Sequence, residues 1–299
     1  MKLPDNTPLH ELIELIGEQL DAQDLFFGHS TSNAWEEANW MCLYVTGQEI
    51  DSDEFDWDSP PTAAQLKQLE LLIKQRIESQ LPFAYMIKEA WFCGLKFYVD
   101  ERVLVPRSYF GEWIPEQFSP WLDANRVHRA LDLCTGSGCI AIALAYAFPE
   151  AEIDATELSE EALAVAQINL EQHQLSARLK LHQGSLFADV QGQYDLICSN
   201  PPYISNLRMD QLPEEFLHEP DMALRAGDDG LDLVDSILLQ AADYLNDGGM
   251  LVVEVGTAAL ALEQKYPKLA FTWLSTEDEA MALFLLDKQQ LIEFKTARK

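Results

Sequence analysis

Residues 194–203, Tyr-Asp-Leu-Ile-Cys-Ser-Asn-Pro-Pro-Tyr, carry polar groups that suit chemistry on a planar nitrogen. The pattern predicts a buried strand that must end at Pro201 and Pro202, because proline has a fixed φ and no N–H for a sheet ladder. The side-chain carbonyl of Asn200 and the backbone carbonyl of Pro201 are then left to accept hydrogen bonds. Two adjacent acceptors match the two N–H bonds of a primary amide or amino group, and Tyr203 adds a flat face for stacking.

These four candidate catalytic residues, Asn200, Pro201, Pro202 and Tyr203, also suit a simple surface turn. Asn-Pro and Pro-Pro are ordinary turn dipeptides, so the motif alone favours a catalytic site only modestly. The segments that precede it in the chain decide between the two interpretations.

A glycine-rich loop lies upstream, between a predicted strand at 130–134 and a predicted helix that begins at Cys139. Its sequence is Thr-Gly-Ser-Gly, and glycines let the backbone approach a ligand closely, as in strand–loop–helix nucleotide sites. Asp132 could contact such a ligand or tie down its own loop, and the cysteines here suit packing better than nucleophilic attack. The candidate cofactor-binding residues of this segment are Asp132, Cys134, Thr135, Gly136, Ser137 and Gly138.

Two further strand ends support a nucleoside site. A strand predicted at 152–156 ends at Glu157, about 20 residues beyond the glycine loop, where an acid is placed to bind both ribose hydroxyls. The strand predicted at 179–183 leads into a Gly-Ser-Leu turn at 184–186. Glu157, Ser185, Leu186 and Asn200 complete the set of candidate cofactor-binding residues.

Alternating strands and helices must position these strand ends. The sequence also predicts a strand at 250–255, a final pair of strands at 271–274 and 281–286, and helices at 231–245 and 259–265. Such alternation predicts a parallel, doubly wound α/β sheet, whose ligands bind outside the carboxyl ends of the strands. Every polar candidate above lies at such an end.

Residues 1–85 follow a different pattern, with apolar residues at helical spacing and three predicted helices, near 9–20, 33–45 and 62–77. Through residue 90 the chain holds 17 acids and five bases. This region could dock a basic protein or serve as a structural cap. Aromatic and β-branched residues from Ala90 to Val105 predict a hairpin that joins it to the rest.

Charge is the unusual feature of the composition. The 299 residues include 20 Lys and Arg against 50 Asp and Glu, which gives a formal net charge of −30. Such acidity repels nucleic acid phosphates and attracts basic partners, although it could equally serve solubility. We therefore expect no direct nucleic acid partner.

Five scattered cysteines without a Cys-x-x-Cys pair indicate a reducing compartment, and six dispersed histidines give no metal-ligand spacing. The longest apolar run, 139–148, is too short to span a bilayer, and the N-terminus lacks a basic signal region. We expect a cytoplasmic protein that binds no metal and no membrane.

Together these motifs resemble the S-adenosyl-L-methionine (AdoMet)-dependent protein-(glutamine-N5) methyltransferases, which modify a glutamine side-chain amide in protein. Asn-Pro-Pro-Tyr at 200–203, His-Glu-Pro at 218–220 and Gly-Asp-Asp-Gly-Leu-Asp at 227–232 carry the resemblance, which covers nearly the whole chain. It implies AdoMet as the cofactor. It also implies the seven-stranded, class I (Rossmann-like) methyltransferase sheet with an antiparallel last strand, preceded by a small all-α domain.

The same resemblance implies that the chain is divided into two domains and a linker. Residues 1–85 would form a helical substrate-recognition domain, 86–108 a β-hairpin linker, and 109–299 the AdoMet-dependent methyltransferase domain.

Two branches of the family are close, one for peptide-chain release factors and one for ribosomal protein L-three. Residues 26–37, 103–108 and 132–139 resemble the second branch in detail, whereas the first would show Gly at position 134 and Pro-Arg-Pro from 106. The resemblance therefore implies methyl transfer to a glutamine of the large-subunit (50S) ribosomal protein L-three, met free or during ribosome assembly.

Ser185 departs from the family, which usually carries an Asp there against the adenine amino group. A serine can still accept one hydrogen bond, but the loss of a charged acceptor should weaken AdoMet binding by about 1 kcal/mol. Glu157 stands for the more common Asp and keeps its chemistry.

Three rival interpretations remain. A release-factor methyltransferase would be separated by offering both protein substrates. A nucleic acid amino-methylating enzyme is disfavoured by the charge and by the lack of a basic stripe. A non-catalytic AdoMet-binding adaptor would form a complex with a basic ribosomal protein without methyl transfer, and only Ser185 hints at it.

Overall fold

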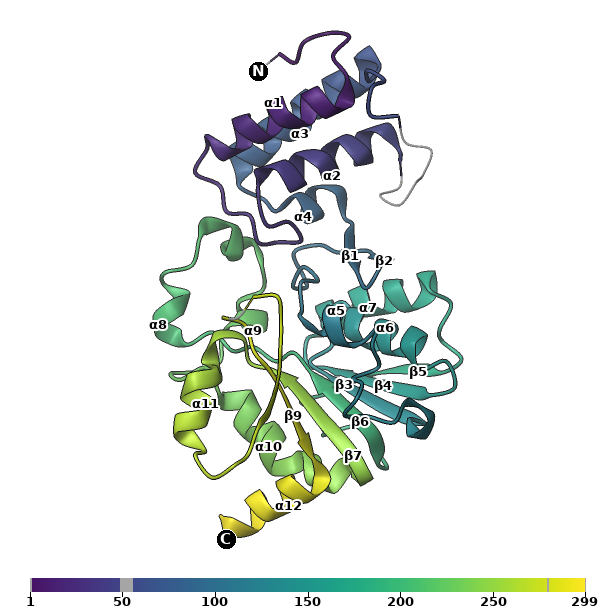
Figure 1. The fold of residues 1–299 in the computed structure, drawn as a ribbon, viewed down its shortest axis with the longest axis vertical. Coiled ribbons are helices and arrows are strands. Elements are labelled where there is room, and N and C mark those ends of the chain that lie inside the picture. The colour runs from purple at the N-terminus through teal and green to yellow at the C-terminus, as the bar shows by residue number, and fades with distance from the viewer. Residues whose placement is uncertain (1, 49–55, 279, 299) are drawn as a thin grey trace. The chain divides into compact units, whose positions relative to one another are not determined.

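The computed structural model describes residues 2–48, 56–278 and 280–298. The chain divides into two compact units, the first made of residues 1–88 with 213–218 and the second of residues 89–212 with 219–299. The first is helical and the second is α/β (Figure 1). Among the described residues, the helices all fall short of the length and apolar character needed to cross a membrane.

The first unit is built from amphipathic helices whose starts follow the sequence. The side chain of Asn33 accepts a hydrogen bond from the Glu36 N–H, and Thr62 and Gln65 form a reciprocal capping box. Its elements are α1 (Leu9–Asp21), α2 (Ala34–Thr46), α3 (Ala63–Ser79), α4 (Phe83–Ile87) and the 3₁₀ helix η2 (Glu214–His218).

Arg76 of α3 is the buried polar centre of the first unit, with 1% of its surface exposed. Its Nε donates to Glu37 at 2.8 Å, Nη1 donates to Glu215 at 3.3 Å, and Nη2 donates to the Phe26 carbonyl at 3.0 Å. Glu215 also accepts the Phe26 N–H at 2.8 Å. A buried guanidinium needs such partners, so segment 213–218 is part of this unit's structure.

The second unit contains a seven-stranded sheet of order β5-β4-β3-β6-β7-β9-β8. Strands β3 to β7 run parallel, and β9 is antiparallel to both β7 and β8. This topology confirms the predicted Rossmann-like sheet with an antiparallel last strand. The strands are β3 (Arg129–Leu133), β4 (Glu152–Glu157), β5 (Leu179–Gln183), β6 (Tyr194–Ser199), β7 (Leu245–Glu254), β8 (Thr272–Leu274) and β9 (Leu283–Asp287).

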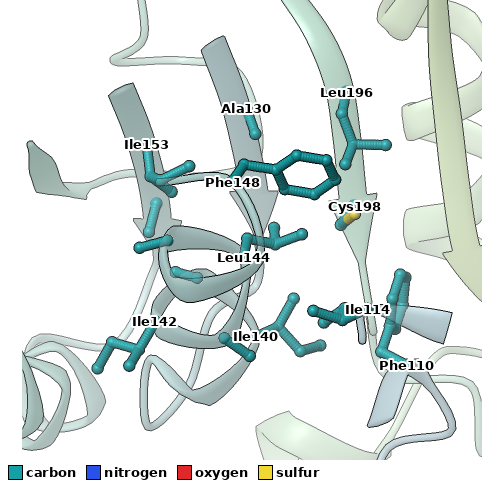
Figure 2. Close-up of a cluster of buried hydrophobic side chains, with 14 of the residues drawn as sticks. Phe110, Ile114, Ala130, Ile140, Ile142, Leu144, Phe148, Ile153, Leu196 and Cys198 are labelled. Atoms are coloured by element: carbon teal, nitrogen blue, oxygen red, sulfur yellow. The ribbon is translucent and has the colours of Figure 1, made fainter. Parts of the chain in front are cut away.

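Helices cover both faces of the sheet because successive strand residues point to opposite sides. Ala130 and Leu196 pack in one cluster with Leu144, while Leu131 and Ile197 belong to a second cluster. Figure 2 shows Leu144 and neighbouring side chains filling the first cluster beneath the strands. The first face is covered by α5 (Phe110–Trp113), α6 (Cys139–Ala147) and α7 (Glu160–Gln172), and the second by α10 (Asp232–Tyr244), α11 (Ala259–Lys265) and α12 (Lys288–Ala297).

The connections differ from the sequence prediction in two places. The hairpin is short, with β1 (Ala90–Phe92) antiparallel to β2 (Leu95–Phe97), whereas 102–105 is not a strand. The β-branched residues at 102–105 face a cavity instead of a neighbouring strand. The C-terminal α12, which the sequence pattern did not indicate, begins with a capping box of Asp287 and Gln290.

Short helical turns follow β6: α8 (Asn206–Met209) and α9 (Asp221–Leu224). Together with η1 (Ala124–Arg126) and η3 (Gly256–Ala258), they complete the second unit's helical segments within the described residues. An isolated parallel bridge between Ile204 and Arg225 holds the chain after β6 against the chain after α9.

Candidate functional site

A cavity with about 1000 Å³ of empty space, part of it open to solvent, lies at the carboxyl ends of β3, β4 and β6. A sheet whose order reverses between β3 and β6 leaves a crevice at that point. Nine predicted site residues line the cavity: Cys134, Thr135, Gly136, Ser137, Glu157, Ser185, Leu186, Asn200 and Pro202. The other four, Asp132, Gly138, Pro201 and Tyr203, lie outside its lining.

The glycine loop is held in a conformation that glycine favours. Gly136 has φ +54° and Gly138 has φ +81°, and a side chain on Gly136 would project into open space. Behind the loop, the fully buried Asp132 accepts the Thr135 hydroxyl at 2.5 Å and the Ala141 N–H at 3.2 Å. Asp132 therefore fastens the loop to the start of α6, which is the structural alternative that the sequence left open.

Asn169 of α7 is a contributor that the sequence analysis missed. Its side chain is buried and donates to the Ser137 carbonyl at 2.8 Å and to the Tyr98 carbonyl at 3.0 Å. Its carbonyl accepts the Tyr98 N–H at 2.7 Å. The loop is thus supported from α7 as well as from β3.

Glu157 ends β4 with its carboxylate turned to the glycine loop. Oε2 accepts the Gly136 N–H at 2.9 Å, and Oε1 accepts the Ser159 N–H at 2.9 Å. Each carboxylate oxygen has a further lone pair, so both can also accept a hydroxyl from a ligand in the cavity.

The turn after β5 supplies the next part of the wall. Ser185 is exposed at the cavity and Leu186 is buried, with φ +51°. The Gly184 N–H donates to the Glu157 carbonyl at 2.9 Å, which fixes this turn beside the end of β4.

Asn200 follows the last residue of β6 and lines the cavity with Pro202. Among the described residues, none donates to the Asn200 side chain or to the Pro201 carbonyl. The preceding Ser199 is fully buried and donates to the Leu133 carbonyl at 2.9 Å, which holds the end of β6 against β3. Within the described part of the chain, these two acceptors therefore have no protein donor, and Asn200 is the one that lines the cavity.

Tyr203 does not line the cavity, and its predicted role as a stacking surface stays a prediction. Its hydroxyl donates to Glu254 at 3.3 Å, and a side chain at Gly256 would overlap its ring. Its carbonyl lies so close to Gly230 that a side chain there would also overlap. Tyr203 is therefore half-buried, with its hydroxyl, ring and carbonyl all in contact with later segments of the same unit.

Residues 102–108 form a wall that the sequence analysis did not assign to the site. Arg107 donates to both oxygens of Glu219, at 2.5 and 2.6 Å, and Glu219 also accepts the Val105 N–H at 3.1 Å. The charged pair ties this wall to Pro220 and Met222, which line the same cavity. The contacts join residues more than a hundred positions apart, so local patterns could not reveal them.

Burial changes the ionisation of several groups around the cavity. It raises the pKa of Asp132 to about 7, although the Thr135 hydroxyl and the Ala141 N–H oppose the rise. It also raises the pKa of the Cys134 thiol, and that of the Cys139 thiol to about 12. Both thiols are therefore protonated near neutral pH, which makes them weak nucleophiles.

Comparison with known proteins agrees with this geometry. Residues 117–230 match the family described as Methyltransferase small domain. A ribosomal protein uL3 glutamine methyltransferase from Neisseria meningitidis serogroup B is 42% identical over 287 residues, covering 96% of this chain and 95% of that protein. A protein of the same name from Neisseria gonorrhoeae is 42% identical over 287 residues and 96% of each chain.

A solved structure shows the same fold at low identity. The hMettl16 catalytic domain, in complex with a 3′UTR hairpin, aligns with a TM-score of 0.51 at 15% identity, covering 82% of this chain and 92% of that one. The sheet order, the glycine loop at the switch point and these matches define a Rossmann-like, AdoMet-dependent methyltransferase. By its identity to relatives over nearly its full length, the chain belongs to the family of ribosomal protein uL3 glutamine methyltransferases. This confirms the resemblance and its ribosomal branch.

The cavity residues fit AdoMet. The open space above Gly136 admits a ligand close to the backbone, and the Glu157 carboxylate keeps acceptor capacity for ribose hydroxyls. The mainly apolar wall and a few fixed polar groups are typical of small-molecule cofactor sites.

Proposed function

We propose that this enzyme transfers the methyl group of AdoMet to the side-chain amide nitrogen of a glutamine in ribosomal protein uL3, the L-three protein of the sequence analysis. The 42% identity to proteins of that name, which extends over nearly the full length of the chain, supports this substrate. The observation that carries the chemistry is the pair of acceptors, Asn200 and the Pro201 carbonyl, left without donors among the described residues.

Asn200 and Pro201 would receive the two N–H bonds of the glutamine amide. An amide nitrogen is a poor nucleophile because its lone pair is delocalised into the carbonyl, so its orientation dominates the rate. Fixing a reactive approach contributes roughly 7–11 kcal/mol to barrier reduction in favourable cases. The same acceptors would stabilise positive charge that develops on the nitrogen. The nitrogen would gain the methyl group as the sulfonium–methyl bond breaks, S-adenosylhomocysteine would leave, and the methylated amide would release one N–H proton to water.

On the cofactor side, AdoMet supplies an electrophilic methyl group when bound. Glu157 would hold its ribose, and the loop residues Thr135, Gly136 and Ser137 would face its amino acid part. Ser185 and Leu186 would border the adenine. Asp132, Cys134 and Gly138 would shape the loop, and Pro202 would fix the direction of the Pro201 carbonyl.

The acidic first unit would attract uL3 as a basic substrate. Its described helices carry acids on exposed faces, such as Glu11, Glu14 and Glu18 of α1. A surface of this sign favours encounter with a positively charged protein and repels nucleic acid. We place the reaction in the cytoplasm, with uL3 met either free or during ribosome assembly.

The test is methylation of purified uL3 with isotopically labelled AdoMet, followed by peptide mass spectrometry. One glutamine of uL3 should gain a single methyl group, and a purified release factor should gain none. Methylation of the release factor alone would overturn the substrate assignment. A stable complex with uL3 but no transfer would instead indicate a binding adaptor.

A further inference from the structure

Glu254, the last residue of β7, is a buried carboxylate that receives hydrogen bonds from two segments of the site. It is only 1% exposed. Its Oε2 accepts the Ser108 hydroxyl at 2.6 Å and the Tyr109 N–H at 3.1 Å, and its Oε1 accepts the Tyr203 hydroxyl at 3.3 Å. Ser108 lines the cavity, whereas Glu254 does not.

The connection from Tyr203 to the acceptors is stiff. Pro201 and Pro202 separate Tyr203 from Asn200, and each proline fixes its own φ. The Tyr203 ring also packs against Gly256, where a side chain would overlap it. An anchor on the Tyr203 hydroxyl therefore constrains the direction of the Pro201 carbonyl.

We propose that Glu254 is a positioning residue for methyl transfer, which aligns the Asn200–Pro201 acceptors through Tyr203 and holds the Ser108–Tyr109 turn beside the same cavity. The inference deepens the proposed function and rests on it. Glu254 acts on the reaction through its neighbours, because it does not line the cavity.

The ionised form of Glu254 is the one that can accept all three donors. Burial raises the pKa of Glu254 to about 7, while Ser108, Tyr109, Tyr203 and the positive charge of Arg107 oppose the rise. The pKa values of the phenols of Tyr109 and Tyr203 are raised, so both stay protonated near neutrality. Protonation of Glu254 would place a hydrogen on an oxygen that now accepts, and the methyl transfer rate should therefore rise with pH through about 7.

The matched experiment compares Glu254→Gln with Asp195→Asn. Asp195 also accepts backbone N–H groups, from His128 at 2.8 Å and Arg129 at 3.0 Å, but at the opposite end of β6 from Asn200. The measurements are kcat on uL3, the AdoMet Kd by calorimetry, and kcat against pH from about 6 to 8.5.

Glu254→Gln should lower kcat about 10- to 100-fold at the high end of this range, as expected for misplaced reacting groups. It should also flatten the pH profile and change the AdoMet Kd by less than about threefold. Ser108→Ala removes one donor to the charged form, so it should move the rise in rate to higher pH. Asp195→Asn should leave the shape of the profile unchanged.

Wild-type kcat with an intact pH profile in Glu254→Gln would overturn the inference, as would an equal loss of kcat in Asp195→Asn. Hydrogen exchange of the AdoMet-bound enzyme gives a readout that does not depend on uL3. In Glu254→Gln, exchange should accelerate in the peptide that contains Tyr109 and in the peptide that contains Tyr203. In Asp195→Asn, exchange of these two peptides should not change. Unchanged exchange in Glu254→Gln would contradict the proposed link from Glu254 to these two segments. If exchange accelerates but the wild-type enzyme does not methylate uL3, only the proposed substrate is contradicted.

Discussion

The two ends of the cavity differ in whether their polar groups have hydrogen-bond partners within the described part of the protein. At the cofactor end, each carboxylate oxygen of Glu157 already accepts a backbone N–H group. At the acceptor end, no described residue donates to Asn200 or to the Pro201 carbonyl.

The difference separates binding from catalysis. Groups that are satisfied within the protein are already organised and can hold a cofactor without rearrangement. Acceptors that the protein leaves unsatisfied gain their partners only from water or substrate, so their interaction energy is available to the reaction. Substitutions at the two ends should therefore have different kinetic effects.

The largest effect is expected for Asn200→Ala. Loss of one oriented acceptor should reduce kcat on uL3 by about 10²- to 10³-fold, while the AdoMet Kd changes only a few-fold. Single-turnover methylation and calorimetry measure the two quantities. Asn206→Ala is the control, since Asn206 bonds Asp228 and Arg225 outside the cavity lining. Near-normal turnover of Asn200→Ala would refute its role.

The reverse pattern is expected for Glu157→Ala. The change removes the acceptor of the Gly136 and Ser159 N–H groups together with the proposed ribose ligand. AdoMet affinity should fall by roughly 10- to 100-fold, because charged hydrogen bonds contribute about 1.5–3 kcal/mol each. Calorimetry measures it, and turnover at saturating AdoMet should fall much less. A selective loss of kcat would contradict the division between the two ends.

Near each end of the cavity lies a buried carboxyl group whose pKa is raised by burial. These raised pKa values predict how the stability of the fold depends on pH. The pKa values of Asp132 and Glu254 are both raised to about 7, so the folded chain binds these protons more tightly than the unfolded chain. Their contribution to stability is fully present below their unfolded pKa values, near pH 4, and is lost as pH rises to about 7.

The free energy of unfolding should therefore fall by roughly 1 kcal/mol per pH unit for each group across this window. Urea unfolding between about pH 5 and 8 measures the slope. Asp132→Asn and Glu254→Gln should each flatten it. An unchanged slope in both variants would show that neither group takes up a proton on folding.

The smallest effect is expected for Ser185→Asp at the cofactor end. If the Ser185 position borders the adenine, a charged acceptor there should strengthen AdoMet binding by about 1 kcal/mol, or roughly fivefold. Calorimetry with AdoMet is the measurement, and Asp189→Ser, which changes a nearby exposed acid, is the control. Unchanged or weaker AdoMet binding would mean that the turn at Ser185 does not contact the adenine.

Much of the second unit could be predicted because its signals are local. The strands at 129–133, 179–183 and 194–199 and the helix at 259–265 follow from short apolar runs and their end residues. The glycine loop and the prolines after β6 act on their own backbone, so their consequences are visible in a single sequence.

The remaining features depend on contacts between distant segments. Residues 102–105 have strand-like composition, yet Glu219 accepts the Val105 N–H and bonds Arg107, which holds the segment at the cavity. Tyr203 was predicted to stack on the substrate amide, and that role stays a prediction. Its backbone carbonyl lies close to Gly230 and its ring lies close to Gly256, and both glycines belong to later parts of the chain.

The position of Glu215 in the first unit has a practical consequence for dissecting this enzyme. A fragment ending at residue 88 would deprive the buried Arg76 guanidinium of one carboxylate and the Phe26 N–H of its acceptor. Exchange of the helical unit between relatives, to alter which protein they methylate, would need to transplant residues 213–218 along with it.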